Sequence, residues 1–203
     1  RIKGKTTYAM EGSIFIAGAG VQWLRDRMKF FKKAQDTEKI IKSLKSNSDV
    51  YLVPAFTGLG APYWDSNSRG VLSGLTRDTG PKEIIRATVE SVAYQTYDLF
   101  EAMKHDGLRP RLVKVDGGMV MNNWFSQFLS DVVNVGVLRP KVQETTALGA
   151  AFMAGLQIGV YKSLKDISQN WSLDRKFLPK MKNNNRTKLL KGWSKAIKRT
   201  LVN

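Results

Sequence analysis

Two glycine-bearing segments of this sequence are each followed closely by an amide side chain. Gly18 precedes Gln22, and the run Asp116-Gly117-Gly118 comes before Asn122. Glycine leaves the backbone bare, so a ligand can approach it closely. The start of a following helix offers free N–H groups and a positive end to a phosphate or a ribose. An amide side chain can donate and accept hydrogen bonds, for example at an adenine ring. One interpretation is therefore a phosphate or ribose site at residues 116–122 and a flat ligand such as adenine against the backbone at Gly18.

Each segment also has a purely structural interpretation, and the residues alone leave both open. The run at 116–118 is equally typical of an ordinary strand-to-helix turn with Asn122 or Asn123 as the N-cap. Gly18 and Gly20 each cost a helix about 1 kcal/mol relative to alanine, and close packing against a neighbouring helix would account for them. The complete Gly-x-Gly-x-x-Gly fingerprint and the Walker A pattern are both missing. The sequence thus supports neither a Rossmann dinucleotide site nor a P-loop.

Residues 55–70 read as a long loop that contains three glycines, a proline and the aromatic residues Phe56, Tyr63 and Trp64. Loops of this length in compact domains are often functional or are packed by their own side chains. We interpret the aromatic rings as the core of the loop. Asp65 and Arg69 are expected to pair across the loop and hold it, in preference to a catalytic role for Asp65.

The elements that must position these segments alternate along the chain. Apolar periodicity and turn residues predict strands over 6–10, 50–54, 70–75, 112–115 and 135–138, and helices over 14–31, 37–44, 81–105, 122–133, 146–158 and 186–201. Gly80, Pro81 and Glu83 give the third helix a clear start. The small residues between 147 and 155 predict close packing of the fifth helix. Such alternation indicates an α/β domain with a substantially parallel sheet.

Composition excludes several classes of protein. There is no cysteine, which rules out a disulfide scaffold, a cysteine zinc site and a thiol nucleophile, and His105 is the only histidine. No run of about 18 apolar residues occurs, and the first residues lack an apolar signal region, so neither a membrane-spanning helix nor a signal peptide is expected. These features are consistent with a cytoplasmic protein.

The net charge of +16 is concentrated toward the ends of the chain. Residues 51–174 are formally neutral, whereas all ten charged side chains in residues 175–203 are basic. A basic tail with few interleaved aromatic residues is a weak signal for nucleic acid. A nucleic-acid partner is therefore not expected, and the final lysines and arginines are interpreted as a solvated helix face.

Several motifs, in order, resemble those of the FGGY carbohydrate kinases. The stretch 56–70 is similar to the loop of the family members that phosphorylate glycerol, and residues 70–90 resemble the family's carboxyl-terminal signature. The other matching motifs are Tyr8-Ala-Met-Glu-Gly, the segment from Gly18 to Asp26, Val115-Asp-Gly-Gly, and Thr146-Ala-Leu-Gly-Ala-Ala-Phe-Met-Ala-Gly. The resemblance covers about residues 6–180.

The resemblance implies a fold and a division of the chain. The fold would be α/β: a ribonuclease-H-like ATPase domain of the actin, Hsp70 and sugar-kinase type, with a mixed sheet flanked by helices. Residues 1–180 would form the family's carboxyl-terminal, nucleotide-binding domain, without the amino-terminal domain. Residues 181–203 would form a basic helical tail that the fold does not need.

The resemblance also implies an activity, the ATP-dependent transfer of a phosphoryl group to glycerol with Mg²⁺. Carried over by motif, the nucleotide-binding residues would be Gly18, Gln22, Gly117, Gly118 and Asn122. Asp116 would lie near Mg²⁺, through water. The general base and most of the glycerol site belong to the absent domain, so no catalytic residue is assigned here and the chain alone is expected to be inactive.

The resemblance implies an adenine nucleotide, glycerol and the amino-terminal domain as partners. It also implies that the longer protein forms a homo-oligomer and that it does not bind a membrane. Two alternatives stay open. The chain could be the same domain of another FGGY sugar kinase, or a non-catalytic basic binding module.

Overall fold

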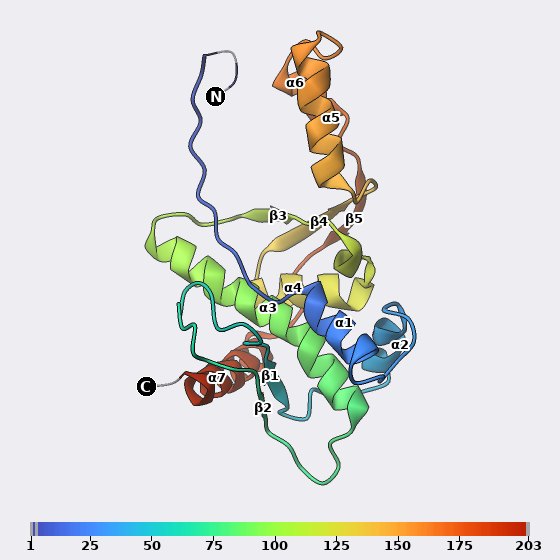
Figure 1. The fold of residues 1–203 in the computed structure, drawn as a ribbon, viewed down its shortest axis with the longest axis vertical. Helices are drawn as coiled ribbons and strands as arrows, with labels where there is room; N and C mark the ends of the chain where they lie inside the picture. Colours follow the sequence, from blue (N-terminus) through green and yellow to red (C-terminus); the bar gives the residue numbers. More distant parts are fainter. Residues whose placement is uncertain (1, 3, 202–203) are drawn as a thin grey trace.

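The computed structural model describes residue 2 and residues 4–201. The helices are α1 (Gly18–Asp26), α2 (Asp36–Lys42), α3 (Pro81–His105), α4 (Asn123–Val133), α5 (Thr145–Gln157), α6 (Leu164–Gln169) and α7 (Asn183–Thr200), with a short 3₁₀ helix, η1 (Gly118–Met121). The strands are β1 (Tyr51–Val53), β2 (Val71–Ser73), β3 (Leu112–Lys114), β4 (Gly136–Pro140) and β5 (Leu173–Phe177). Figure 1 shows α3 crossing the middle of the molecule, with α5 and α6 projecting away from the body.

Helix α3 is the element on which the others pack. It begins as the sequence predicts: Pro81 is its first residue, and the Glu83 carboxylate accepts a hydrogen bond from the Gly80 backbone N–H at 2.9 Å. Most residues from Ile85 to Tyr94 are buried. Helices α1, α2 and α4 and strand β1 contact it. The same large apolar cluster includes residues of α3, α4, β4 and α7, so α3 joins the two halves of the chain.

The strands form two small sheets. In one, β1 and β2 run antiparallel, and in the other β4 pairs with β3 in parallel and with β5 in antiparallel orientation. The α/β class with a mixed sheet is confirmed, but the prediction of a substantially parallel sheet is wrong. The sequence analysis missed β5 because four of its five residues are exposed and three are charged, as suits an edge strand.

Three other predicted elements differ from the structure. Residues 6–10 form no strand and are exposed, because an extended segment needs a neighbouring strand for its hydrogen bonds. The helix predicted over 14–31 is confined to α1: Ala17 has non-helical backbone angles, and Lys29 has a φ of 58°, which a continuing helix cannot contain. The small residues of α5 are mostly exposed, and only Gly155 is buried, against Tyr161. Helix α6 was not predicted.

The last helix, α7, is not a solvated appendage. Trp193, Ala196, Ile197 and Thr200 are buried, and the Trp193 ring stacks on Tyr94 of α3 with ring centroids 5.3 Å apart. The expectation that the fold does not need this segment is therefore wrong. Its apolar residues Leu190, Trp193 and Ile197 recur at helical spacing, but the many basic side chains between them led to the interpretation of a solvated helix. Residues 202 and 203 of the predicted tail lie outside the described residues.

We expect Trp193→Ala to lower the free energy of unfolding by about 3–5 kcal/mol, the usual result of removing a large aromatic side chain from a core. Trp193 is 1% exposed, so the cavity would lie within the core. Lys195→Ala, on the exposed side of the same helix, is the matched control and should change stability by about 0.5 kcal/mol or less. Urea unfolding followed by circular dichroism measures both. Equal, small effects would show that α7 does not dock on α3.

Candidate functional site

The structure brings the two glycine-bearing segments together around one hollow. The hollow has a volume of about 440 Å³ and lies between α1, α2, η1 and the N-cap residue of α4, Asn122, a size suited to a small ligand. Its lining residues are Gly18, Val21, Gln22, Ala34, Gln35, Thr37, Glu38, Val89, Gly118, Met119, Met121 and Asn122. Four of the predicted binding residues are thus neighbours in space, although about 100 residues separate the two segments in the chain.

The glycines at the hollow leave open space beside the backbone. Gly18 is the first residue of α1, and a Cβ atom added there or at Gly118 would meet no atom within 4 Å. Gly20 differs, because its added Cβ would lie 3.0 Å from the Thr88 methyl group of α3. The close-packing interpretation therefore holds for Gly20, whereas Gly18 and Gly118 present bare backbone to the hollow.

The turn before η1 depends on Gly117. This residue has φ 82° and ψ 173°, a combination open essentially to glycine alone. Its N–H donates to the carbonyl oxygen of Gln143 at 3.3 Å. The chain can therefore reverse sharply after β3 and bring Gly118 to the edge of the hollow. Gly117 itself does not line the hollow.

Asn122 holds two walls of the hollow in place. Its Oδ1 accepts a hydrogen bond from the Phe125 backbone N–H at 2.9 Å, which is the N-cap role that the sequence left as an alternative. Its Nδ2 donates to the Thr37 hydroxyl of α2 at 3.4 Å. The side chain thus ties α4 to α2, and only part of its hydrogen-bonding capacity is left for a ligand.

The sequence analysis missed the carboxylate of Glu38, which also lines the hollow. It accepts hydrogen bonds from Lys42 at 2.5 Å and from the Asn123 backbone N–H at 3.1 Å. Burial opposes its ionisation, but these two hydrogen bonds prevail and set the pKa of Glu38 below its ordinary value. The i,i+4 spacing of Glu38 and Lys42 was visible in the sequence, but the direction in which the pair faces depends on the packing of α2 against α4.

Asp116 lies two residues after β3, next to the glycine turn, and does not line the hollow. Its carboxylate is exposed and accepts a hydrogen bond from the Thr145 hydroxyl of α5. Within residues 4–201 and residue 2, no group of three histidine or acidic side chains could hold a metal ion. A divalent ion here would need oxygen atoms of a bound phosphate in addition to Asp116, as is common for Mg²⁺.

Comparison with known proteins identifies the family. A family model described as the C-terminal domain of the FGGY family of carbohydrate kinases matches residues 2–158. The chain belongs to this family. Glycerol kinase 1 of Pseudomonas aeruginosa is 55% identical over 199 residues, a match that covers 98% of this chain and 40% of that protein. The chain therefore spans about two fifths of the length of such relatives.

Solved structures agree. A crystal structure of Plasmodium falciparum glycerol kinase with ADP superimposes with a TM-score of 0.85 at 36% identity, over 95% of this chain and 38% of that one. A xylulose kinase from Lactobacillus acidophilus gives a TM-score of 0.77 at 24% identity, over 93% of this chain and 38% of that one, and so supports the fold alone. These likenesses confirm the expected ribonuclease-H-like ATPase fold of the sugar kinases.

In this FGGY domain, the loop over residues 55–70 is held by its own polar groups. The Asp65 carboxylate accepts from the backbone N–H groups of Asn67 and Ser68 and from the Ser68 hydroxyl. Arg69 donates to backbone carbonyl oxygens of the loop. Both side chains thus stabilise the loop, and Phe56 packs against Trp23 of α1 at 5.0 Å between ring centroids.

One carboxylate joins the loop to both α3 and α7 of the domain. The Asp98 carboxylate accepts hydrogen bonds from the Tyr63 hydroxyl at 2.9 Å and from the Trp193 indole N–H at 2.6 Å. Burial raises the pKa of Asp98 to about 6, although both hydrogen bonds act in the opposite direction. Sequence analysis could not find this group, because its partners, Tyr63 and Trp193, come from distant segments.

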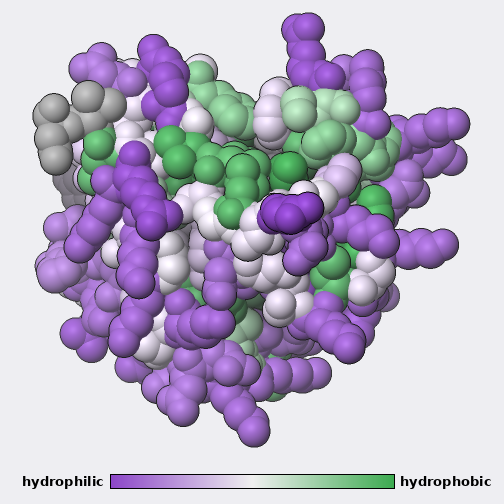
Figure 2. Space-filling model, turned by 90° about the horizontal axis from the view of Figure 1, so that it is seen from below, coloured by the Kyte–Doolittle hydropathy of each residue, from purple (hydrophilic) through white to green (hydrophobic). Residues whose placement is uncertain are grey.

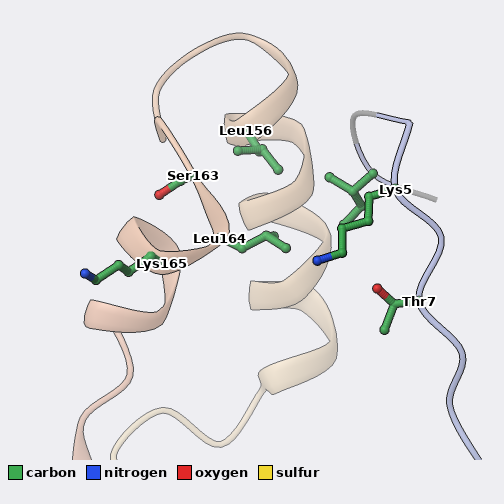
Figure 3. A pocket seen from close by; sticks show the side chains of 7 residues that line it. Lys5, Thr7, Leu156, Ser163, Leu164 and Lys165 are labelled. Carbon is green, nitrogen blue, oxygen red and sulfur yellow. The ribbon is translucent and has the colours of Figure 1, made fainter.

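A second hollow, of about 620 Å³, lies between the amino-terminal segment and the α5–α6 arm. Figure 3 shows Lys5 pointing toward α5, whereas Lys165 points away from the amino-terminal segment. The basic groups at this hollow therefore do not converge on one point, and none of the predicted binding residues lines it.

In the described part of the family domain, no helix is both long enough and apolar enough to cross a bilayer.

We expect Asp98→Asn to change how the stability depends on pH. The pKa of Asp98 is about 6 in the folded protein and about 4 in an unfolded chain, so the folded state binds more protons between these values. The contribution of this carboxyl group to stability is fully present below about pH 4 and is lost as the pH rises through about 6, a change of about 3 kcal/mol.

Urea unfolding of both proteins from about pH 4 to about pH 7 measures the effect. The wild type should lose stability relative to Asp98→Asn as the pH rises, because the asparagine does not titrate. A constant difference between the two proteins would show that Asp98 titrates near its ordinary value in the folded state.

Proposed function

We propose that this chain is the nucleotide-holding part of an ATP-dependent glycerol kinase, and that an adenine nucleotide binds in the hollow between α1, α2 and η1. One observation carries the proposal: the two glycine segments meet there, and both Gly18 and Gly118 present bare backbone to open space. The relative from Pseudomonas aeruginosa is named a glycerol kinase, and the Plasmodium falciparum glycerol kinase was solved with ADP.

The residues fit such a ligand. Bare backbone at Gly18 lets a flat ring approach α1, with the Gln22 amide one turn further along the same wall. The turn at Gly117 and Gly118 gives a negatively charged phosphate group close access to the backbone at the start of η1. The Glu38 carboxylate repels such groups, so we place the phosphates at the Gly118 side and the ring near α1 and α2.

Asp116 is the group on this chain that would contact Mg²⁺, through water. A bound Mg²⁺ supplies neutralisation of the phosphate charge during transfer. The hydrogen bond from the Thr145 hydroxyl holds the Asp116 carboxylate beside the glycine turn. Asp116 thus offers an oriented acceptor for water molecules at the place where we propose the phosphates lie.

The reaction proposed for the longer protein is in-line transfer of the γ-phosphoryl group to a primary hydroxyl of glycerol. Positioning of the two substrates supplies most of the catalysis in such reactions. We propose that the general base and most of the glycerol site lie in the part of the relatives that this chain does not cover. A cytoplasmic location and a homo-oligomer of the longer protein complete the proposal.

We expect Gly118→Val to weaken ADP binding by about tenfold or more, because the added side chain would occupy the space of the ligand. The fold should remain, since no atom lies within 4 Å of the added Cβ and Gly118 does not need a positive φ. Titration calorimetry with ADP measures the affinity.

Gly149→Val is the matched control for this experiment. An added Cβ at Gly149 also meets open space, but Gly149 lies on α5 and not at the hollow. The control should bind ADP as the wild type does. Equal affinity of Gly118→Val and wild type would contradict the assignment of the hollow.

We expect the chain alone to show no glycerol-dependent release of ADP from ATP and Mg²⁺. Loss of a general base typically lowers a rate by about 10²- to 10⁴-fold, and loss of acceptor orientation lowers it further. A coupled ADP assay, with a full-length glycerol kinase as positive control, measures the activity. Glycerol-dependent turnover by this chain would show that acceptor site and base lie here and would overturn the division of roles.

A further inference from the structure

A row of lysines runs along the outer side of α7. Lys188, Lys191, Lys195 and Lys198 follow the spacing i, i+3, i+7 and i+10, and all are exposed. At about 1.5 Å of rise per residue, the row is about 15 Å long. The lysine row, as we call these residues, shares no residue with the hollow proposed for the nucleotide.

The packing of α7 fixes the direction of the row. Trp193 and Ile197 are 1% and 3% exposed on the opposite side of the helix, and Arg199 donates to the Ser73 hydroxyl of β2 at 2.6 Å. The helix therefore cannot turn its lysines inward without losing its core contacts. Figure 2 views the side on which α7, β1 and β2 lie in Figure 1, and long hydrophilic side chains project from most of this face.

The charge of the row is largely uncompensated. Residues 175–203 contain no acidic side chain. Lys188 pairs with Asp49 at 3.3 Å, whereas the other members of the row form no ion pair with any residue that the structure describes. Like charges one helical turn apart destabilise a helix, so the fold itself gains nothing from this arrangement.

We propose that the lysine row binds an acidic helical segment of another protein, with carboxylates at the matching spacing. The pair of Lys188 with Asp49 shows within the chain that a carboxylate reaches the row. A facing helix repeats its side chains with the same period as α7, so one carboxylate can meet each lysine in turn. The backbone of α7, which carries the lysine row, is held in place by its buried residues.

The same observations disfavour two other modes of binding to a polyanion: insertion of α7 into a membrane and stacking of single-stranded bases on α7. Amphipathic helices bind membranes through their apolar face, and the apolar face of α7 is buried in the core. Single-stranded nucleic acid is bound through stacking on aromatic side chains, and the only aromatic residue of α7, Trp193, is buried. An acidic helix needs neither an apolar nor an aromatic contact from the row.

The probe is a labelled alanine-based helical peptide with glutamates at i, i+3, i+7 and i+10, and its control carries glutamines there. Fluorescence anisotropy with the full chain, at about 10 mM and about 0.1 M salt, measures binding with weak and with strong screening. We expect binding of the glutamate peptide at low salt that weakens at high salt, and no binding of the glutamine peptide.

The triple variant Lys191→Gln, Lys195→Gln, Lys198→Gln should bind the glutamate peptide about tenfold more weakly. Its matched control is Lys32→Gln, Lys45→Gln, Lys165→Gln, which removes the same charge from exposed lysines elsewhere and should bind as the wild type does. Equal losses in both variants, or no binding of the peptide, would overturn the proposal. Tighter, row-dependent binding to duplex DNA or to phosphatidylserine vesicles would do so as well, by assigning the row to another partner.

Discussion

The carboxylate of Glu90 has no exposed surface, so its negative charge must be balanced by neighbouring side chains inside the core. Arg86 pairs with it at 2.7 Å, and the Tyr94 hydroxyl donates to it at 2.9 Å. Burial raises the pKa of Glu90, while Arg86 and Tyr94 act to lower it. A buried charge without its partner is strongly destabilising, so α3 must keep all three side chains in one register. Arg86 also donates to the Leu44 carbonyl oxygen after α2.

This constraint on α3 sets the shape of the proposed nucleotide site. Val89, next to Glu90, lines the hollow, and Thr88 contacts the position at which Gly20 of α1 lacks a side chain. Helix α1 is thus seated on α3 with its first residue, Gly18, at the opening. Asn122 then joins α4 to α2 across the hollow. The site is built between elements that the buried network already fixes, and most of its lining residues lie on helices.

The sequence predicted what is decided locally and missed what is decided by packing. The start of α3 was correct because Gly80, Pro81 and Glu83 act within one turn. Gly18 and Gly118, which line the hollow, were singled out because bare backbone at the start of a helix is itself a signal. The burial of Trp193 was missed because the basic residues of α7 were interpreted as a solvated face, although Leu190, Trp193 and Ile197 recur at helical spacing. Whether Gly18 or Gly20 packs closely likewise depends on where α1 meets α3.

The hydrogen bond from Trp193 to Asp98 spans 95 residues of sequence. A ribosome adds about 5–20 residues per second, so α3 is made about 5–20 seconds before the indole that covers it. Until α7 is synthesised, Trp193 cannot cover the Asp98 carboxyl group and the Tyr94 ring, so this part of the core stays exposed to solvent in the nascent chain. Self-association through this exposed apolar surface competes with folding during the interval, so the yield of folded protein depends on how fast α7 docks.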